Sequence, residues 1–262
     1  MTSSALRLKD KVVIVTGGAQ GIGRAYALGM SVEGARLVIA DINLSAAQAT
    51  SSDIIGQGGQ ALAIKTDVSS FESTQELARE ANNHFGRIDV LVNNAAVFER
   101  NKMARVPFWE LDPGEWDRAM SVNLKGTFLC CRAVFPYMRA QGGGKIINIA
   151  SAAALVGSLN QLHYSSSKAG VLGMTKSLAR ELGEYDINVN CIAPGATQNW
   201  DSSDGAEFER RADVLQQLLP KRPMKRIELP EDIVGTAVFL ASSDSDFVTG
   251  QTIVVDGGEI MH

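Results

Sequence analysis

The strongest structural pattern in this chain of 262 residues is Val12-Val13-Ile14-Val15-Thr16-Gly17-Gly18-Ala19-Gln20-Gly21-Ile22-Gly23. Its first four residues are apolar and β-branched, which predicts a strand buried on both faces. Gly17, Gly21 and Gly23 then predict a turn, and a helical stretch follows at 24–33. Such glycines let the backbone approach a pyrophosphate, and the helix N-terminus offers free N–H groups and the positive end of its dipole. Strand, glycine turn and helix in this order indicate a dinucleotide-binding loop, although glycine-rich turns also make plain connections.

Apolar runs and helical stretches alternate along the rest of the chain. Further strands are expected at 35–40, 61–66, 88–92, 145–150, 188–192 and 251–255, and further helices at 45–56, 70–85, 113–138, 163–182 and 230–240. This alternation implies right-handed crossovers and a parallel sheet of about seven strands with helices on both faces. We therefore expect one doubly wound α/β domain over residues 1–262.

The composition argues against several classes of protein. Apolar residues make up 45% of the chain and charged residues 21%, as in ordinary globular proteins with a substantial core. The net charge of −4 gives no reason to expect nucleic acid or an anionic membrane as a partner. No apolar run is long enough to span a membrane, and no signal peptide is recognisable. Three cysteines fit reduced thiols better than a disulfide framework, so a cytoplasmic location is expected.

An acidic residue at the end of the second strand bears on the choice of dinucleotide. Asp41 stands close to the position where a carboxylate holds the hydroxyls of the adenosine ribose. It would repel the 2′-phosphate of NADP, and neither Gln20 nor Ile42 offers that phosphate a cation. The sequence therefore favours NAD as cofactor. The alternative is that Asp41 only caps a turn.

A tyrosine and a lysine four residues apart form the clearest candidate for chemistry. On a helix, Tyr164 and Lys168 lie on the same face, and a nearby positive charge favours the tyrosine anion. Such a pair can exchange a proton with an alcohol or ketone near neutral pH. By itself the spacing also fits an ordinary amphipathic helix.

Several motifs in a fixed order resemble the short-chain dehydrogenase/reductase superfamily over nearly the whole chain. They are Thr16-Gly17-x-x-x-Gly21-Ile22-Gly23, Asp67-Val68, Asn93-Asn94-Ala95-Ala96, Asn123, Ser151, Tyr164-x-x-x-Lys168, Pro194-Gly195 and Val255-Asp256-Gly257-Gly258. The resemblance implies a Rossmann-type fold and an NAD(H)-dependent oxidoreductase. Such an enzyme moves a hydride between nicotinamide and a secondary alcohol or its ketone.

The resemblance also implies roles for individual residues. Tyr164 would be the general acid/base, and Lys168 would lower its pKa and hold the nicotinamide ribose. Ser151 would hydrogen-bond the reacting oxygen. Asn123 would bend its helix and hold a water of the proton relay, whereas the residues alone predict an exposed polar site inside a helix. The implied cofactor-binding set, which includes no metal ligand, is Gly17, Gln20, Gly21, Ile22, Gly23, Asp41, Ile42, Asp67, Val68, Asn94, Ala95, Ala96, Tyr164, Lys168, Pro194, Gly195, Thr197 and Asn199.

The chain departs from the family pattern in places that bear on the cofactor and on the substrate. Thr197 takes a position that is usually aliphatic, Asn199 replaces a threonine, and Ala96 stands where glycine is common. We expect the substrate between Ser151, Tyr164, the region of Phe98 to Trp109, and a substrate-specificity lid at about 196–226. Candidate wall residues are Leu155, Val156, Gln161, His163 and Trp200, each of which could instead be a loop residue facing solvent. His163 would point about 100° away from Tyr164 on a helix and is assigned no catalytic role.

The sequence leaves two other functions open and also bears on how copies of the chain assemble. A 3-oxoacyl-carrier-protein reductase would need a basic docking patch, for which Arg132, Arg139 and Lys145 are the candidates. A non-catalytic dinucleotide sensor or scaffold would not need the proton relay. Small residues on the Tyr164 helix, including Gly170 and Gly173, suggest close packing against another helix, and the resemblance implies a homotetramer.

Overall fold

The computed structural model describes residues 6–98, 105–198, 213 and 215–261. Its seven strands form one parallel sheet in the order β3-β2-β1-β4-β5-β6-β7. They are β1 (Val12–Thr16), β2 (Arg36–Asp41), β3 (Gln60–Lys65), β4 (Val90–Asn93), β5 (Gly144–Ile149), β6 (Ile187–Pro194) and β7 (Thr252–Val255). The seven expected strands are thus confirmed, with their ends shifted by one or two residues.

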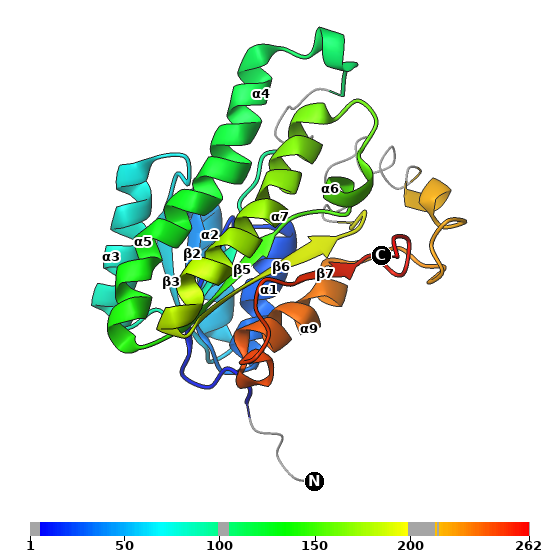
Figure 1. Ribbon diagram of the computed structural model, residues 1–262. Coiled ribbons are helices and arrows are strands. Elements are labelled where there is room, and N and C mark those ends of the chain that lie inside the picture. The colour runs from blue at the N-terminus through cyan, green and yellow to red at the C-terminus, as the bar shows by residue number, and fades with distance from the viewer. Residues whose placement is uncertain (1–5, 99–104, 199–212, 214, 262) are drawn as a thin grey trace.

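Helices cover both faces of this sheet (Figure 1). One face is packed by α1 (Gly21–Val32), α2 (Leu44–Gly56) and α9 (Pro230–Ala241). The other face is packed by α3 (Phe71–Phe85), α5 (Gly126–Gln141) and α7 (Leu162–Leu182). Because the sheet is covered twice, β1 is buried at every position, which explains its continuous apolar run.

The strand order reverses next to β1. The chain first winds outward through β2 and β3, and then returns to place β4 on the other side of β1. Ligands of open α/β sheets bind at such a switch point, beyond the carboxyl ends of the strands. The glycine turn after β1 and the Asn94 segment after β4 therefore meet there.

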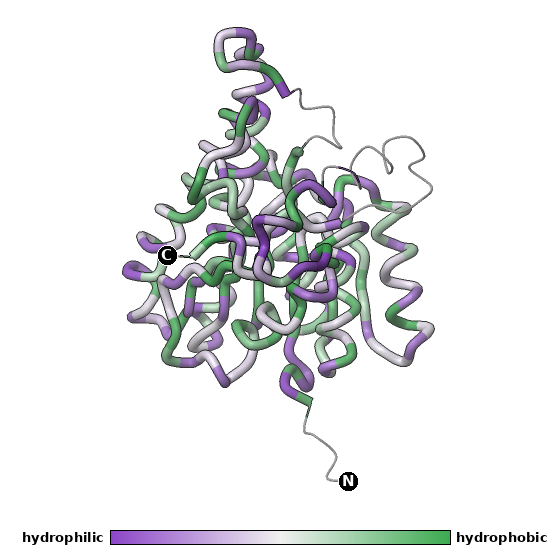
Figure 2. The backbone as a smooth tube through the Cα atoms, turned by 90° about the vertical axis from the view of Figure 1, so that its right-hand side faces the viewer, coloured by the Kyte–Doolittle hydropathy of each residue, from purple (hydrophilic) through white to green (hydrophobic). Residues whose placement is uncertain are grey.

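The helix expected at 113–138 differs from the prediction in its centre. It begins as α4 (Pro113–Ala119), continues through a π-helical segment, Met120–Lys125, and ends as α5 three residues later than expected. Pro113 occupies the first turn and Asp112 accepts hydrogen bonds from the N–H groups of Gly114 and Glu115, so the start follows ordinary capping rules. The start of α4 projects beyond the rest of the molecule in Figure 1 and, from the side, in Figure 2.

Two further expectations about helices can be judged. Gly170 of α7 packs against Leu124 of the same chain, since a Cβ at Gly170 would lie 2.8 Å from a Leu124 methyl carbon. Gly173 faces open space. Gly170 therefore allows close packing within the chain, whereas the packing of this helix against a second subunit stays a prediction. Within the described residues, no helix is both long and apolar enough to cross a membrane.

Candidate active site

A cavity of about 1280 Å³ opens at the carboxyl ends of the strands. It is lined by the segments that follow all seven strands, from β1 to β7. The predicted site residues that line it are Gly17, Gln20, Gly21, Ile22, Gly23, Asp41, Ile42, Asp67, Val68, Asn94, Ala95, Ala96, Ser151, Tyr164, Lys168, Pro194, Gly195 and Thr197. Asn123 lies outside the lining, and Asn199 lies outside the described residues. One cavity thus unites the nucleotide-binding pattern with the tyrosine–lysine pair.

The glycine turn is fitted tightly against the end of β4. A Cβ on Gly23 would lie 2.1 Å from the Gly17 carbonyl oxygen, and Gly17 itself has a φ of +62°. The Asn94 amide donates to the carbonyl oxygens of Thr16 at 3.0 Å and Gly17 at 3.1 Å. No side chain caps the N-terminus of α1, so its first N–H groups remain available to an anion. The turn therefore has the geometry that a pyrophosphate site requires.

Asp41 both lines the cavity and fixes its own turn. Its carboxylate accepts hydrogen bonds from the N–H groups of Ala19 at 3.2 Å and Asn43 at 3.0 Å. Its neighbours in the lining, Gln20, Ile42 and Asn43, carry no positive charge. Asp41 therefore caps a turn, as the alternative expected, and its carboxylate also lies at the cavity wall.

Tyr164 also lines the cavity, in contact with Ser151 and Phe98. Burial raises the pKa of Tyr164, and a hydrogen bond with Ser151 partly offsets this increase. The rings of Phe98 and Tyr164 pack with their centroids 4.6 Å apart. Ser151 follows β5, so the sheet places its hydroxyl beside the phenol. A substrate oxygen could therefore contact both hydroxyl groups at once.

Lys168 is 3% exposed, and its Nζ donates to the Ile149 carbonyl oxygen at 2.7 Å. Burial lowers the pKa of this lysine to about 8. Its Nζ lies 5.9 Å from the centre of the Tyr164 ring. Both side chains are removed from water, which raises the pKa of Tyr164 and lowers that of Lys168. The lowering of the Tyr164 pKa by Lys168 that the resemblance implies stays a prediction.

Asn123 is completely buried, so the expectation of an exposed polar site is wrong. Its amide oxygen accepts from the Val97 N–H at 2.8 Å, and its Nδ2 donates to the Val97 carbonyl at 3.2 Å. Nδ2 also donates to Ser167 Oγ at 3.0 Å, and that hydroxyl donates to the Tyr164 carbonyl at 2.8 Å. Asn123 therefore joins the segment after β4 to the helix that carries Tyr164, from within the π-helical segment.

The candidate wall residues have different positions. Val156 and Gln161 line the cavity, whereas Leu155 and His163 do not, and Trp200 is outside the described residues. His163 is buried, which lowers its pKa, and neither ring nitrogen has a hydrogen-bond partner among the described residues. The solvent-facing alternative is therefore wrong for His163.

Sequence reasoning missed several residues of the lining. They include Arg118, Glu259 and Ile260, whereas Arg105, Leu215, Leu218 and Lys221 lie in the two segments that were expected near the substrate. Glu259 and Ile260 follow β7, and the rule that parallel strands end at one edge of a sheet could have placed them there. No comparable signal marks Arg118, because it lies on α4 and a helical pattern does not show which distant segments the helix faces.

Comparisons with known proteins agree with this geometry. The model of a family described as enoyl-(acyl carrier protein) reductase matches residues 17–259. A (2S)-[(R)-hydroxy(phenyl)methyl]succinyl-CoA dehydrogenase subunit of Thauera aromatica is 41% identical, with 96% of this chain and 97% of the relative covered. The chain belongs to the short-chain dehydrogenase/reductase superfamily.

Two further members of this superfamily extend the comparison. Sorbitol dehydrogenase of Cereibacter sphaeroides is 40% identical, with 98% of this chain and 100% of the relative covered. The crystal structure of levodione reductase superposes with a TM-score of 0.89 at 31% identity, covering 97% of this chain and 98% of that one. The relatives are dehydrogenases and reductases, and this short-chain dehydrogenase/reductase is accordingly an oxidoreductase.

Proposed function

We propose that this short-chain dehydrogenase/reductase is an NAD(H)-dependent enzyme that interconverts a secondary alcohol and its ketone. The observation that carries the proposal is that one cavity is lined both by the glycine turn and by Ser151, Tyr164 and Lys168. An extended dinucleotide could reach from Asp41 to the tyrosine within this cavity.

The predicted cofactor-binding residues fit NAD. The uncapped N-terminus of α1 and the glycine turn would hold the pyrophosphate, and Asp41 the hydroxyls of the adenosine ribose. Asp67 and Val68 would line the adenine site, and Asn94, Ala95 and Ala96 the middle of the cofactor. Lys168, Pro194, Gly195, Thr197 and Asn199 would hold the nicotinamide half. When bound, the cofactor supplies a hydride acceptor or donor.

The predicted catalytic residues would handle the proton. Ser151 would hold the substrate oxygen through its hydroxyl group, where negative charge develops. In the oxidation direction Tyr164, as the phenolate, would accept the hydroxyl proton, and in reduction the phenol would return it. Lys168 would stabilise the phenolate. Asn123, which Ser167 links to the backbone of Tyr164, would hold a water of the relay.

The direction and the substrate class follow from the cofactor and the family. An NAD preference suits oxidation of an alcohol or a sugar hydroxyl, in keeping with the name of the Cereibacter sphaeroides relative. The segment at about 196–226 would act as a lid, and its described residues Leu215, Leu218 and Lys221 line the cavity.

The rival functions gain no support from the described surface. For a carrier-protein reductase, Arg132 lies over the Phe71 ring, Arg139 lies over the Tyr185 ring, and Lys145 pairs with Asp246 at 2.8 Å. These three cations are therefore engaged by their own chain. A sensor would have no use for the Ser151–Tyr164 hydrogen bond inside the cavity.

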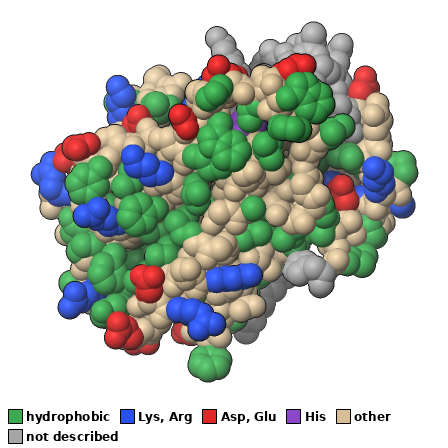
Figure 3. Space-filling view, turned by 45° about the horizontal axis from the view of Figure 1, so that its top comes forward, with side chains coloured by type: hydrophobic (Ala, Val, Ile, Leu, Met, Phe, Trp, Pro, Cys, Tyr) green, Lys and Arg blue, Asp and Glu red, His purple; other side chains and the backbone are tan. Residues whose placement is uncertain are grey.

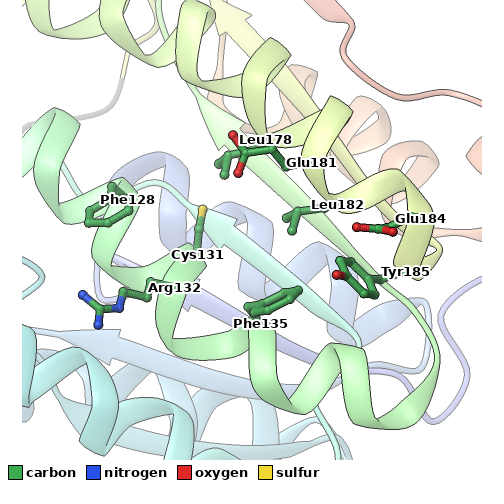
Figure 4. A pocket seen from close by; sticks show the side chains of 9 residues that line it. All are labelled: Phe128, Cys131, Arg132, Phe135, Leu178, Glu181, Leu182, Glu184 and Tyr185. Atoms are coloured by element: carbon green, nitrogen blue, oxygen red, sulfur yellow. The ribbon is translucent and has the colours of Figure 1, made fainter.

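A second proposal concerns assembly and location. A groove of about 430 Å³ lies between α5 and α7 (Figure 4). Its lining is Phe128, Cys131, Arg132, Phe135, Leu178, Glu181, Leu182, Glu184 and Tyr185. Phe128 is 44% exposed, and the face in Figure 3 carries hydrophobic side chains interspersed with Lys and Arg. We propose that such a face packs against a second copy in a homotetramer in the cytoplasm, where the three buried free cysteines would stay reduced.

Replacing Tyr164 by Phe tests the proposed reaction. The variant should lose turnover of secondary alcohols with NAD by at least a hundredfold. NADH binding, followed by fluorescence, should change by less than about threefold, since only one hydroxyl is removed. Tyr137→Phe, on α5 and away from the cavity, is the matched control and should behave as wild type. Residual turnover of Tyr164→Phe above a tenth of the wild-type rate would contradict the assigned role.

A further inference from the structure

A buried charged cluster lies beside the segment that follows β6. Arg222 is 2% exposed and Glu228 is 4% exposed, and each comes from the irregular stretch between the cavity-lining Leu218 and α9. Removing an ion from water costs several kcal/mol unless good partners replace the water. The partners of these two side chains therefore indicate what their burial stabilises.

Arg222 holds the backbone of the segment that follows Pro194. Its guanidinium donates to the Ala196 carbonyl and to the Glu259 carboxylate, each at 3.3 Å, and to the Arg226 carbonyl at 3.3 Å. The same guanidinium lies 3.7 Å from Glu228. Ala196 and Glu259 both line the cavity, so one buried cation joins two of its walls.

Glu228 holds Thr197, which follows Ala196 in the segment after Pro194. Its Oε1 accepts a hydrogen bond from the Thr197 hydroxyl at 3.0 Å, and its backbone carbonyl accepts from the Gln198 N–H at 2.8 Å. A Cβ on Gly195 would lie 2.6 Å from Glu228 Oε2, so the carboxylate packs closely against that glycine. Glu228 thus explains why a threonine is acceptable at position 197, because its hydroxyl has a buried acceptor.

We propose that Glu228 and Arg222 are positioning residues that hold Gly195 to Gln198 against the nicotinamide half of the cavity, and that ionisation of Glu228 couples cofactor affinity to pH. This inference rests on the proposed function, because it assigns the nicotinamide to that part of the cavity. Neither side chain lines the cavity itself, so both act through the segment that they hold.

The surroundings of Glu228 put its titration in the physiological range. Burial raises its pKa to about 7, while the Thr197 hydrogen bond and the charge of Arg222 lower it. The titratable and charged groups around the cluster come from α1, α9, the segment after β7 and the stretch before α9. They are Tyr26, Arg222, Arg226, Asp232, Asp256 and Glu259.

The sign of the pH effect follows from these contacts. Above pH 7 the carboxylate is ionised, accepts from Thr197 and attracts Arg222, so the segment is held firmly. Below pH 7 protonation of Glu228 weakens both interactions. Ordering Gly195 to Gln198 then costs free energy when NADH binds, so NADH binds less tightly. The dissociation constant of NADH for the wild type should therefore rise on the order of tenfold between pH 8.5 and pH 6, within the usual range of coupling between two sites.

The test compares NADH binding by Glu228→Gln, Arg222→Met and Thr197→Val across this pH range. The neutral side chain in Glu228→Gln should give a dissociation constant that does not change through the transition near pH 7 and stays at the low-pH value of the wild type, while Lys168, whose pKa is about 8, titrates alike in both proteins. Arg222→Met should bind less tightly at pH 8.5. Thr197→Val removes a hydrogen bond that lowers the pKa of Glu228, so its midpoint should move to higher pH. Glu231→Gln, an exposed position in the first turn of α9, is the matched control and should keep the wild-type profile.

The wild-type measurement keeps the test decisive even where a variant does not fold. A wild-type dissociation constant that is the same at pH 6 and pH 8.5 would overturn the inference. So would a wild-type pH profile in Glu228→Gln, since the titrating group would then lie elsewhere. A wild type that binds no NADH at any pH would refute the proposed function, and this inference with it. If the dissociation constant of NADH depends on pH in the wild type and does not change near pH 7 in Glu228→Gln, both the proposed function and this inference are supported.

Discussion

Replacing Asn123 by Ala should destabilise the protein, although the residue stands in the middle of a helix where alanine is favoured. The amide of Asn123 satisfies both the N–H and the carbonyl of Val97, a residue that is 7% exposed. A buried backbone group without a partner costs about 1–3 kcal/mol, so two such groups should cost about 2–6 kcal/mol. Ser167 loses the hydrogen bond from Asn123 but keeps its own hydrogen bond to the Tyr164 carbonyl, so it should add little to the loss of stability.

Urea unfolding at a fixed protein concentration measures this loss, and hydrogen exchange at the Val97 amide locates it. The Val97 N–H should exchange faster in the variant, because its acceptor is gone. Asn83→Ala, on the exposed face of α3, is the control and should change the free energy of unfolding by less than about 0.5 kcal/mol. A loss below about 1 kcal/mol with unchanged exchange at Val97 would refute the reasoning, since the amide would then not be needed to satisfy that backbone.

Three further predictions concern the cofactor site and its lysine. Asp41→Ala should shift the ratio of NAD to NADP turnover towards NADP by at least tenfold, and a wild-type preference for NADP would show the cofactor assignment to be wrong. Gly23→Ala should abolish NADH binding, because its Cβ would lie 2.1 Å from the Gly17 carbonyl oxygen, whereas Gly56→Ala, which meets no atom within 4 Å, should bind normally. Burial lowers the pKa of Lys168 to about 8, so the unfolded chain binds more protons than the folded chain between pH 8 and pH 10.5, and stability should rise with pH there. Relative to Lys168→Met, the wild type should gain about 2 kcal/mol of unfolding free energy between pH 7 and pH 9.5, and a constant difference would contradict this.

The elements of the sheet were predictable because their signals are local. The run at β1 is apolar at every position, as a strand covered on both faces requires, and its glycine turn follows directly. The glycines of that turn are needed for backbone conformation and close approach, which act within a few residues. Once the alternation of strands and helices was read, the meeting of the loops at one edge followed from topology alone.

The environment of individual polar side chains was not predictable in the same way. From the residues alone Asn123 was expected to be exposed, because a helical period does not reveal that Val97 lies against it. Nor does the sequence show that burial raises the pKa of Tyr164 and lowers that of Lys168. Both environments depend on chain segments that lie far away in the sequence.

The sequence by itself determined the doubly wound sheet, the glycine turn after β1 and the presence of Ser151, Tyr164 and Lys168 in one cavity. These features rest on periodicity, glycine placement and motif order, which are written along the chain. Only the tertiary structure decided that Asn123 secures Val97 and that Arg222 and Glu228 secure the segment after β6. A buried polar group is stable only when its partner is present, and folding brings that partner from a distant position.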